Sequence, residues 1–175
     1  MSASGNEPRE EAAWAERLEI ETVLTADARS RLKVHQNAVG DVAEVIARHM
    51  GMSREMGEAI GAAAAYHDVG KLQVPTEILC KPGRLTPEEF AVMRHHPTVG
   101  HDLLAQQDGP LAALAARIAL LHHESMDGTG YPQGLVGNAI PLEARIVGVA
   151  DVYDALREDR PYPAKWETTR ELERL

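Results

Sequence analysis

Hydrophobic residues recur every three or four positions along most of the chain, a spacing that is typical of amphipathic helices. The pattern predicts a helix over 31–49 that Gly51 ends, and a second helix over 53–69 with Ser53 as its N-cap and Gly70 as its stop. No stretch alternates apolar and polar residues convincingly over the length of a strand. The sequence therefore predicts an all-α architecture.

Further helix signals follow in the second half of the chain. Helices are predicted over 86–93, where a capping box places Pro at the first helical position, over 97–104 and over 110–122. A glycine-rich loop over 127–139 follows, and Pro141 begins a last helix. From about residue 31 onward, the chain is therefore predicted to be a series of helices.

The first thirty residues differ from the rest. Residues 1–30 carry seven acidic side chains against three arginines, and Trp14, Leu18 and Val23 form a helical stripe that starts near residue 9. We expect a partly helical acidic segment that packs on the domain or extends toward a partner, such as a second copy of the chain. The remaining residues, 31–175, form the expected domain.

The composition narrows the class of protein. A length of 175 residues suits one domain with a full core, and aromatic residues make up only 4% of the chain, which favours helices over a β-sandwich. The formal net charge is −9 without a basic cluster, so neither a nucleic-acid polymer nor an anionic membrane is an expected partner. Cys80 is the sole cysteine, which excludes a disulfide framework.

The sequence also bears on where the protein is located. Residues 1–11 contain no apolar signal region, and nowhere do about 18 apolar residues follow one another. We therefore expect a cytoplasmic location and no membrane segment.

Four side chains that bind metals well fall on the apolar faces of separate predicted helices: His35, His67, His122 and Asp151. A single histidine on such a face is more often a hydrogen-bonded core residue than a ligand. A carboxylate buried among imidazoles is different, because its charge is costly unless a cation neutralises it. Helical bundles build metal sites from side chains on facing helices, so the pattern predicts a metal centre in the core.

Two local motifs make this prediction more specific. Residues 67–71 read HDVGK, and residues 122–132 read HHESMDGTGYP. With these motifs in this order, the chain resembles an HD-GYP domain, a branch of the HD phosphohydrolase superfamily that hydrolyses the bacterial messenger cyclic di-GMP. The resemblance covers about residues 31–165 and implies a helical bundle with a metal centre in its core.

The resemblance also implies roles for individual residues. Asp68 would bridge two metal ions, and Asp68 and Lys71 would act in catalysis. Lys71, Tyr131 and Arg160 would contact the substrate. The implied metal ligands are His35, His67, Asp68, His96, His122, His123 and Asp151. Five imidazoles and two carboxylates suit Fe, Mn or Zn better than Mg or Ca, and the family typically uses iron or manganese.

The sequence departs from the family pattern in three places. Arg31 stands where some relatives carry a glutamate that holds a third metal, so we expect a dinuclear site. Pro163 follows the Arg160-Pro161-Tyr162 segment where the family often has a basic residue. The chain ends at Leu175, short of the final helical segment that is usual in the family.

Several polar residues have a second interpretation. His95 neighbours His96, but successive helical residues point in different directions, and we choose His96 as the inward one. The His101-Asp102 pair is interpreted as a surface feature. Glu124 is either a partner of a ligand imidazole or a surface charge, and Asp127 either stabilises its own turn or orients a ligand.

Three functions are compatible with these observations. The leading hypothesis is a metal-dependent phosphodiesterase that hydrolyses cyclic di-GMP to linear pGpG, to GMP or to both. An alternative is an HD-type phosphohydrolase acting on another nucleotide or cyclic dinucleotide. A third is a metal-bound signalling module with little turnover, which recruits partners such as diguanylate cyclases.

Overall fold

The fold is built from helices joined by short connections. The computed structural model describes residues 26–157, and within this range it has no named strand, only one isolated bridge between Asp127 and Val136. This agrees with the predicted all-α class. In chain order the elements are α2 (Ala26–His49), α3 (Arg54–Ala64), the 3-10 helix η1 (Val69–Gln73), α4 (Thr76–Leu79), α5 (Pro87–Met93), α6 (His96–Leu104), α7 (Pro110–Leu121), the 3-10 helix η2 (Gly137–Ala139) and α8 (Leu142–Arg157).

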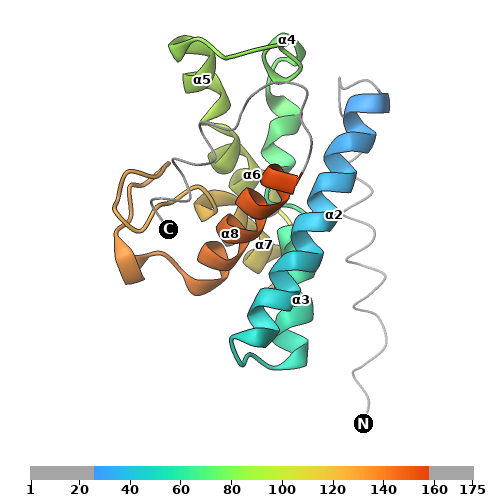
Figure 1. Ribbon diagram of the computed structural model, residues 1–175, viewed down its shortest axis with the longest axis vertical. Coiled ribbons are helices and arrows are strands. Elements are labelled where there is room, and N and C mark those ends of the chain that lie inside the picture. Colours follow the sequence, from blue (N-terminus) through green and yellow to red (C-terminus); the bar gives the residue numbers. More distant parts are fainter. Residues whose placement is uncertain (1–25, 158–175) are drawn as a thin grey trace.

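The longest helix, α2, runs along one side of the molecule, and both α3 and α8 pack against it (Figure 1). Helix α7 packs on α3, α6 and α8, and α6 also packs on η1. The core between these helices consists mainly of alanine and β-branched residues, among them Val39, Ile60, Ile118 and Val147, which are nearly inaccessible to solvent. Small side chains let the helices approach closely, which brings residues from distant parts of the sequence together.

The predicted start signals are confirmed. The Ser53 hydroxyl accepts a hydrogen bond from the backbone N–H of Met56, and Thr86 and Glu89 form the reciprocal capping box at the start of α5. Gly51 follows α2 with a φ of 85°, which favours glycine. Helix α2 begins at Ala26, so the boundary expected at residue 31 falls inside a helix.

One predicted helix end is wrong. Helix α3 stops at Ala64 instead of reaching residue 69, so His67 and Asp68 lie in a tight turn between α3 and η1. The backbone N–H of His67 bonds to the carbonyl of Ala64, three residues back, at 3.0 Å. This tighter winding ends the α-helix and turns the chain toward α6.

Two glycines permit the backbone approaches that position these turns. A Cβ atom at Gly70 would overlap the carbonyl oxygen of His96, and a Cβ atom at Gly148 would lie 2.8 Å from the carbonyl oxygen of His122. Any other residue would push η1 away from α6, or α8 away from the end of α7. The glycines therefore set the spacing between the segments that carry the candidate ligands.

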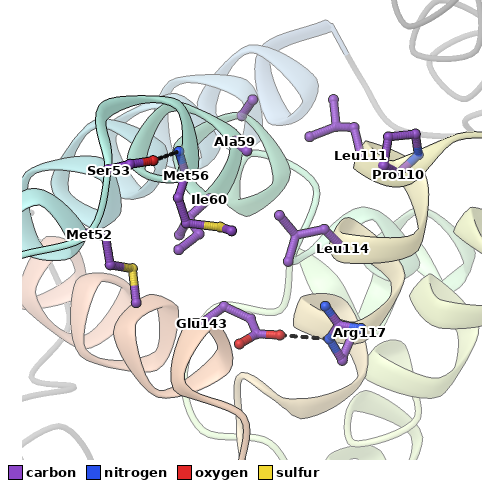
Figure 2. Close-up of a pocket in the computed structure, with 11 residues that line it drawn as sticks. Met52, Ser53, Met56, Ala59, Ile60, Pro110, Leu111, Leu114, Arg117 and Glu143 are labelled. Atoms are coloured by element: carbon purple, nitrogen blue, oxygen red, sulfur yellow. Dashed lines mark hydrogen bonds and ion pairs between the residues drawn. The ribbon is translucent and has the colours of Figure 1, made fainter.

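A large groove lies away from these turns. It has a volume of about 920 Å³ and lies between α3 and the first half of α7. Met52, Met56, Leu111 and Leu114 give it an apolar lining (Figure 2). Its one carboxylate, Glu143, pairs with Arg117 at 2.7 Å, so this groove has no cluster able to bind a metal.

No helix within residues 26–157 combines the length and the apolarity needed to cross a membrane.

Candidate metal centre

The seven side chains predicted as ligands converge in the interior, although they come from five separate parts of the chain. Two lie within helices, His35 in α2 and Asp151 in α8, and His96 is the first residue of α6. The remaining four lie in turns that directly follow α3 and α7: His67, Asp68, His122 and His123. Turns at helix ends allow adjacent residues to point at one centre, which a continuous helix would not permit.

These residues form two groups. His35, His67 and Asp151 form the first, and in it the ligand atoms all lie within 4.8 Å of one another. The second group meets the same limit and consists of Asp68, His96, His122 and His123. Each group is of the size and chemistry that can hold one transition-metal ion.

Asp68 faces both groups. Its Oδ1 atom lies 3.2 Å from Nε2 of His96 and 3.8 Å from Nε2 of His122. Its Oδ2 atom lies 3.4 Å from Nε2 of His67 and 3.9 Å from Nε2 of His35. One carboxylate thus presents one oxygen to each group, which is the geometry of a bridging ligand.

Hydrogen bonds fix the orientation of three imidazoles. The Nδ1 atoms of His67, His96 and His122 lie 2.7–3.2 Å from backbone carbonyl oxygens of their own turns. Because a carbonyl can only accept, each Nδ1 carries a proton and donates it, which leaves the Nε2 lone pair free in the neutral ring. All three Nε2 atoms point toward Asp68.

His35 is oriented by a carboxylate that the sequence analysis missed. Its Nδ1 lies 2.7 Å from Oδ2 of Asp154, and its Nε2 lies 3.1 Å from Oδ1 of Asp151. Asp154 is buried and lies three residues after Asp151 in α8. That spacing, on one face of the last predicted helix, was the only signal available in the sequence.

The electrostatics of the cluster separate its members. Burial disfavours the charged form of Asp68, yet the nearby Lys71 ammonium and the His67 ring hold the pKa of this carboxyl well below its usual range. Burial also opposes protonation of His35, but its contacts with Asp151 and Asp154 raise its pKa to about 9. The metal-free protein therefore balances its buried carboxylates with protonated side chains.

The second group behaves differently. Burial and the neighbouring imidazoles lower the pKa of His122 well below the usual histidine value. Burial, followed by the neighbouring His96 ring, lowers the pKa of His123 to about 3. Both rings are therefore neutral at physiological pH, the form in which imidazole binds a metal.

Two buried atoms in the cluster have no hydrogen-bond partner among the described residues, Nε2 of His67 and Oδ1 of Asp68. Both are acceptors when the His67 ring is neutral and Asp68 is ionised, and a buried acceptor without a partner is costly. A cation in each ligand group would satisfy them, one at His67 and the other at Oδ1 of Asp68. The residues present therefore fit a metal centre.

Lys71 lies beside the cluster. Its Nζ atom donates to Oδ2 of Asp68 at 2.5 Å, three residues along the 3-10 turn. The side chain is partly exposed, so it links the buried carboxylate to the surface. Lys71 is thus paired with a candidate ligand and is not simply a solvated surface lysine.

The loop over 127–139 contains Gly130, Tyr131 and Pro132 and is called the Gly-Tyr-Pro loop below. It covers His123. The Tyr131 ring stacks on the His123 ring, with centroids 4.7 Å apart and an interplanar angle of 26°. Glu124 holds this loop by accepting hydrogen bonds from the backbone N–H groups of Gln133 and Leu135. Neither sequence interpretation of Glu124 is correct, because its carboxylate secures the loop instead of facing an imidazole or solvent alone.

His96 is the inward member of the His95-His96 pair. It is buried in the cluster, whereas His95 is exposed. The His101-Asp102 pair interacts within itself at 3.1 Å, in agreement with the surface interpretation. Asp127 accepts hydrogen bonds from the backbone N–H and the hydroxyl of the threonine two residues later, as expected of a turn residue.

Several sequence expectations fall outside the described residues. These are the substrate contact by Arg160, the replacement at Pro163 and the acidic segment up to residue 25. The backbone of Arg31 belongs to α2, but its side chain is outside the described part of the structure. They remain predictions.

The described residues thus form an all-helical domain with a buried histidine–aspartate cluster that is compatible with a metal centre. The model of the HD domain family matches residues 19–175. The chain belongs to this family.

Relatives in bacteria agree with this assignment. The chain is 51% identical over 125 residues to the "Cyclic di-GMP phosphodiesterase response regulator RpfG" of Xanthomonas campestris pv. campestris (strain 8004), which covers 71% of this chain and 33% of that protein. It is 40% identical over 141 residues to the "3'3'-cGAMP-specific phosphodiesterase 2" of Vibrio cholerae serotype O1, covering 80% of this chain and 27% of that protein. The chain thus spans about a third of the length of these relatives or less.

A solved structure shares the fold. The protein Bd1817 from Bdellovibrio bacteriovorus superposes with a TM-score of 0.63 at 23% identity, over 81% of this chain and 45% of that one. At this identity the likeness supports the helical architecture alone.

Proposed function

We propose that this domain is a metal-dependent phosphodiesterase that hydrolyses cyclic di-GMP to linear pGpG, to GMP or to both. The observation that carries the proposal is the position of Asp68, whose two carboxylate oxygens face two separate groups of ligand atoms. A relative that is half identical over most of the chain is named a cyclic di-GMP phosphodiesterase, which supports the choice of substrate.

The proposed cofactor is a pair of transition-metal ions, iron or manganese, with zinc as the alternative. Histidine nitrogens outnumber carboxylates in both groups taken together, and such nitrogen-rich sites favour these metals over Mg²⁺ and Ca²⁺. The proposed ligands are the seven residues of the two groups, with Asp68 shared. When bound, such ions polarise a phosphodiester and lower the pKa of a coordinated water.

The chain itself contributes charge and orientation. Asp68 holds the two ligand groups together, and the backbone carbonyls behind His67, His96 and His122 keep their Nε2 atoms aimed inward. Lys71 carries a partly exposed ammonium beside Asp68, where it would stabilise negative charge that develops on a phosphate. The Tyr131 side chain, stacked on a candidate ligand ring, would contact the substrate at the edge of the centre.

A second substrate is supported by a specific observation. The Vibrio cholerae relative that is specific for 3'3'-cGAMP is 40% identical over four fifths of the chain. A cyclic dinucleotide with one adenine would meet the same metal ligands, so only contacts with the bases would distinguish the two messengers. This substrate is therefore the alternative within the same reaction class.

The deciding experiment is a turnover assay with metal-loaded protein. Fe(II)- or Mn(II)-loaded protein, kept anaerobic and reducing, is incubated with cyclic di-GMP, 3'3'-cGAMP and bis(p-nitrophenyl) phosphate, and the products are separated by chromatography. Faster hydrolysis of cyclic di-GMP supports the proposal, and preference for 3'3'-cGAMP supports the second substrate. Metal-loaded protein that binds cyclic di-GMP without turnover would instead be a signalling module, for which a diguanylate cyclase is a candidate partner.

A further inference from the structure

The structure carries a group of side chains outside the predicted ligands that lies against the Gly-Tyr-Pro loop. It consists of Phe90 and Arg94, four residues apart on α5 and at its C-cap. The Arg94 guanidinium carbon lies 4.6 Å from the centroid of the Tyr131 ring and 5.9 Å from that of the Phe90 ring. The two rings contact each other edge to face at 6.5 Å.

This group is continuous with the candidate metal centre. The Tyr131 ring that Arg94 contacts also stacks on His123, and His123 contacts the ring of His96 at 5.1 Å. Arg94 also lies two residues before His96 in the sequence. Tyr131 therefore lies between the Arg94 guanidinium and the His123 ring and contacts both.

Its exposure and charge suit a binding role. Among the described residues Arg94 forms no ion pair, and its side chain is exposed, so its charge is available. The Phe90 ring is 44% exposed, although it is the only phenylalanine in the chain. A half-exposed aromatic ring beside a cation without a counter-charge is suited to binding a planar, anionic molecule.

We infer that Phe90, Arg94 and Tyr131 form an outer subsite for the nucleotide half that does not lie over the metal centre. A purine would stack on the exposed aromatic surface, and the planar Arg94 fork would donate two hydrogen bonds to a guanine edge or to a phosphate. Contact with Tyr131 and Phe90 holds the guanidinium in place before the ligand arrives. This inference rests on the proposed function, because it assigns one part of the same substrate.

The net charge of the protein strengthens the assignment to Arg94. A chain with a formal charge of −9 repels a dianionic substrate at long range, so attraction must come from cations near the site. Lys71 is paired with Asp68 at the centre, whereas Arg94 lies directly over the Tyr131 ring without an acidic partner among the described residues.

The test compares four variants of the metal-loaded protein: Arg94→Ala, Arg94→Lys, Phe90→Leu and, as a matched control, Arg54→Ala. Arg54 is an exposed arginine in α3 that pairs with Glu58 and lies in neither the cluster nor the loop. Metal content, KM and kcat for cyclic di-GMP, and its equilibrium Kd are measured for each. Hydrolysis of bis(p-nitrophenyl) phosphate provides a substrate without a base.

Arg94→Ala is expected to raise KM and Kd for cyclic di-GMP about 10-fold or more, with a much smaller change in kcat. The ratio of cyclic di-GMP hydrolysis to ester hydrolysis should fall by a similar factor. Arg94→Lys should recover part of the loss, because it keeps the charge without the fork. Phe90→Leu should weaken binding several-fold with metal content unchanged.

The inference is overturned if Arg94→Ala binds cyclic di-GMP as the wild type does. It is equally overturned if both substrates lose activity in proportion or if metal is lost, because Arg94 would then only support the loop. Failure of the proposed function looks different: the wild-type protein itself would neither bind nor hydrolyse cyclic di-GMP, whatever its variants do.

Discussion

The Nδ1 atom of His35 lies 2.7 Å from Oδ2 of Asp154, which joins the first half of the chain to its last described helix. The same imidazole presents its Nε2 to Asp151, one turn earlier in α8. Asp154 thus acts on the candidate centre through His35, by setting the direction of the ring and increasing its basicity. Carboxylate–histidine pairs of this kind strengthen metal binding by the histidine.

Replacing Asp154 by Asn tests this relationship. The amide has nearly the same shape but no charge, so His35 should bind a metal less strongly. We expect the affinity of one ion to fall about 10-fold or more while the other ion is retained. Competition with a chromophoric chelator measures both affinities, and Asp102→Asn, at an exposed carboxylate, is the control. Equal affinities in Asp154→Asn and wild type would show that Asp154 serves only the packing of α8.

Asp68→Ala should abolish binding of both ions or nearly so. The reason is geometric, since its two oxygens face different ligand groups and neither group has a replacement carboxylate in the same position. Elemental analysis of the purified variant gives the metal content, with Asp41→Ala, an exposed residue of α2, as the control. A variant that keeps its full metal content would contradict a dinuclear centre bridged by Asp68.

Lys71→Ala should keep its metal and slow hydrolysis by about 10²-fold, as expected when a cation near a developing negative charge is lost. Bound ions would replace the lysine as the counter-charge of Asp68, so the loaded variant should still fold. Single-turnover rates on cyclic di-GMP separate this effect from binding. An unchanged rate would mean that Lys71 only balances Asp68 in the metal-free protein.

The hydrogen bonds of the Glu89 carboxylate should make the free energy of unfolding depend on pH. Its carboxylate accepts from Lys81 Nζ at 2.6 Å and from the backbone N–H of Thr86 at 2.7 Å, and these bonds lower its pKa, the lysine most strongly. A carboxyl with a lowered folded-state pKa stabilises the protein at neutral pH, and this contribution is lost in the acid range, as the pH falls below the usual glutamate pKa of 4.5 and through the lowered folded-state pKa. Glu89→Gln should therefore flatten the loss of unfolding free energy in that range.

The measurement is urea unfolding at several pH values for wild type and Glu89→Gln. Lys81→Met should flatten the same part of the profile, and the double variant should add little to either single change. Parallel profiles in wild type and Glu89→Gln would show that the ion pair does not persist in solution. The result matters for α5, because this helix carries Phe90 and Arg94.

The sequence predicted those features that depend on local pattern. The helical class follows from the spacing of apolar residues, and the caps at Ser53 and Thr86 follow from short-range hydrogen bonding. The predicted end of α3 is wrong because the chain continues beyond Ala64 as a turn with hydrogen bonds from residue i to residue i−3. Over three residues such a turn points the His67 side chain inward, as a helix would. Periodicity cannot distinguish the two.

Contacts across the fold were harder to predict. Asp154 meets His35 from 119 residues away, and Arg94 meets Tyr131 across α5 and the Gly-Tyr-Pro loop. Neither residue was given a role in the sequence analysis, because nothing local shows that Asp154 is buried in α8 or that Arg94, at the C-cap of α5, lies over an aromatic ring. Only the packing of α8 on α2, and the position of the loop against α5, distinguishes them from ordinary surface charges.

Gly70 supplies the last prediction, because it sets the distance between η1 and α6. A Cβ atom there would overlap the carbonyl oxygen of His96 and lie 2.6 Å from the backbone nitrogen of Gly100, and both are backbone atoms that cannot rotate away. Gly70→Ala should therefore move Asp68 away from His96. We expect a loss of about 1–3 kcal/mol in unfolding free energy, as for overpacked cores.

Gly100→Ala is the matched control on the same interface. Its Cβ atom would lie 3.3 Å from both the Cβ atom of Ala119 and the backbone nitrogen of Gly70, so the neighbours need to shift only by a few tenths of an ångström, whereas the contacts at Gly70 are true overlaps. Alanine also favours the helix by about 1 kcal/mol over glycine. Stability close to wild type is expected for Gly100→Ala, together with full metal content. Gly70→Ala should lose the ion held by Asp68, His96, His122 and His123 before the other. If Gly70→Ala keeps both ions and wild-type stability, the close approach of η1 to α6 does not set the geometry of the centre, and the orientation of Asp68 must come from its own turn.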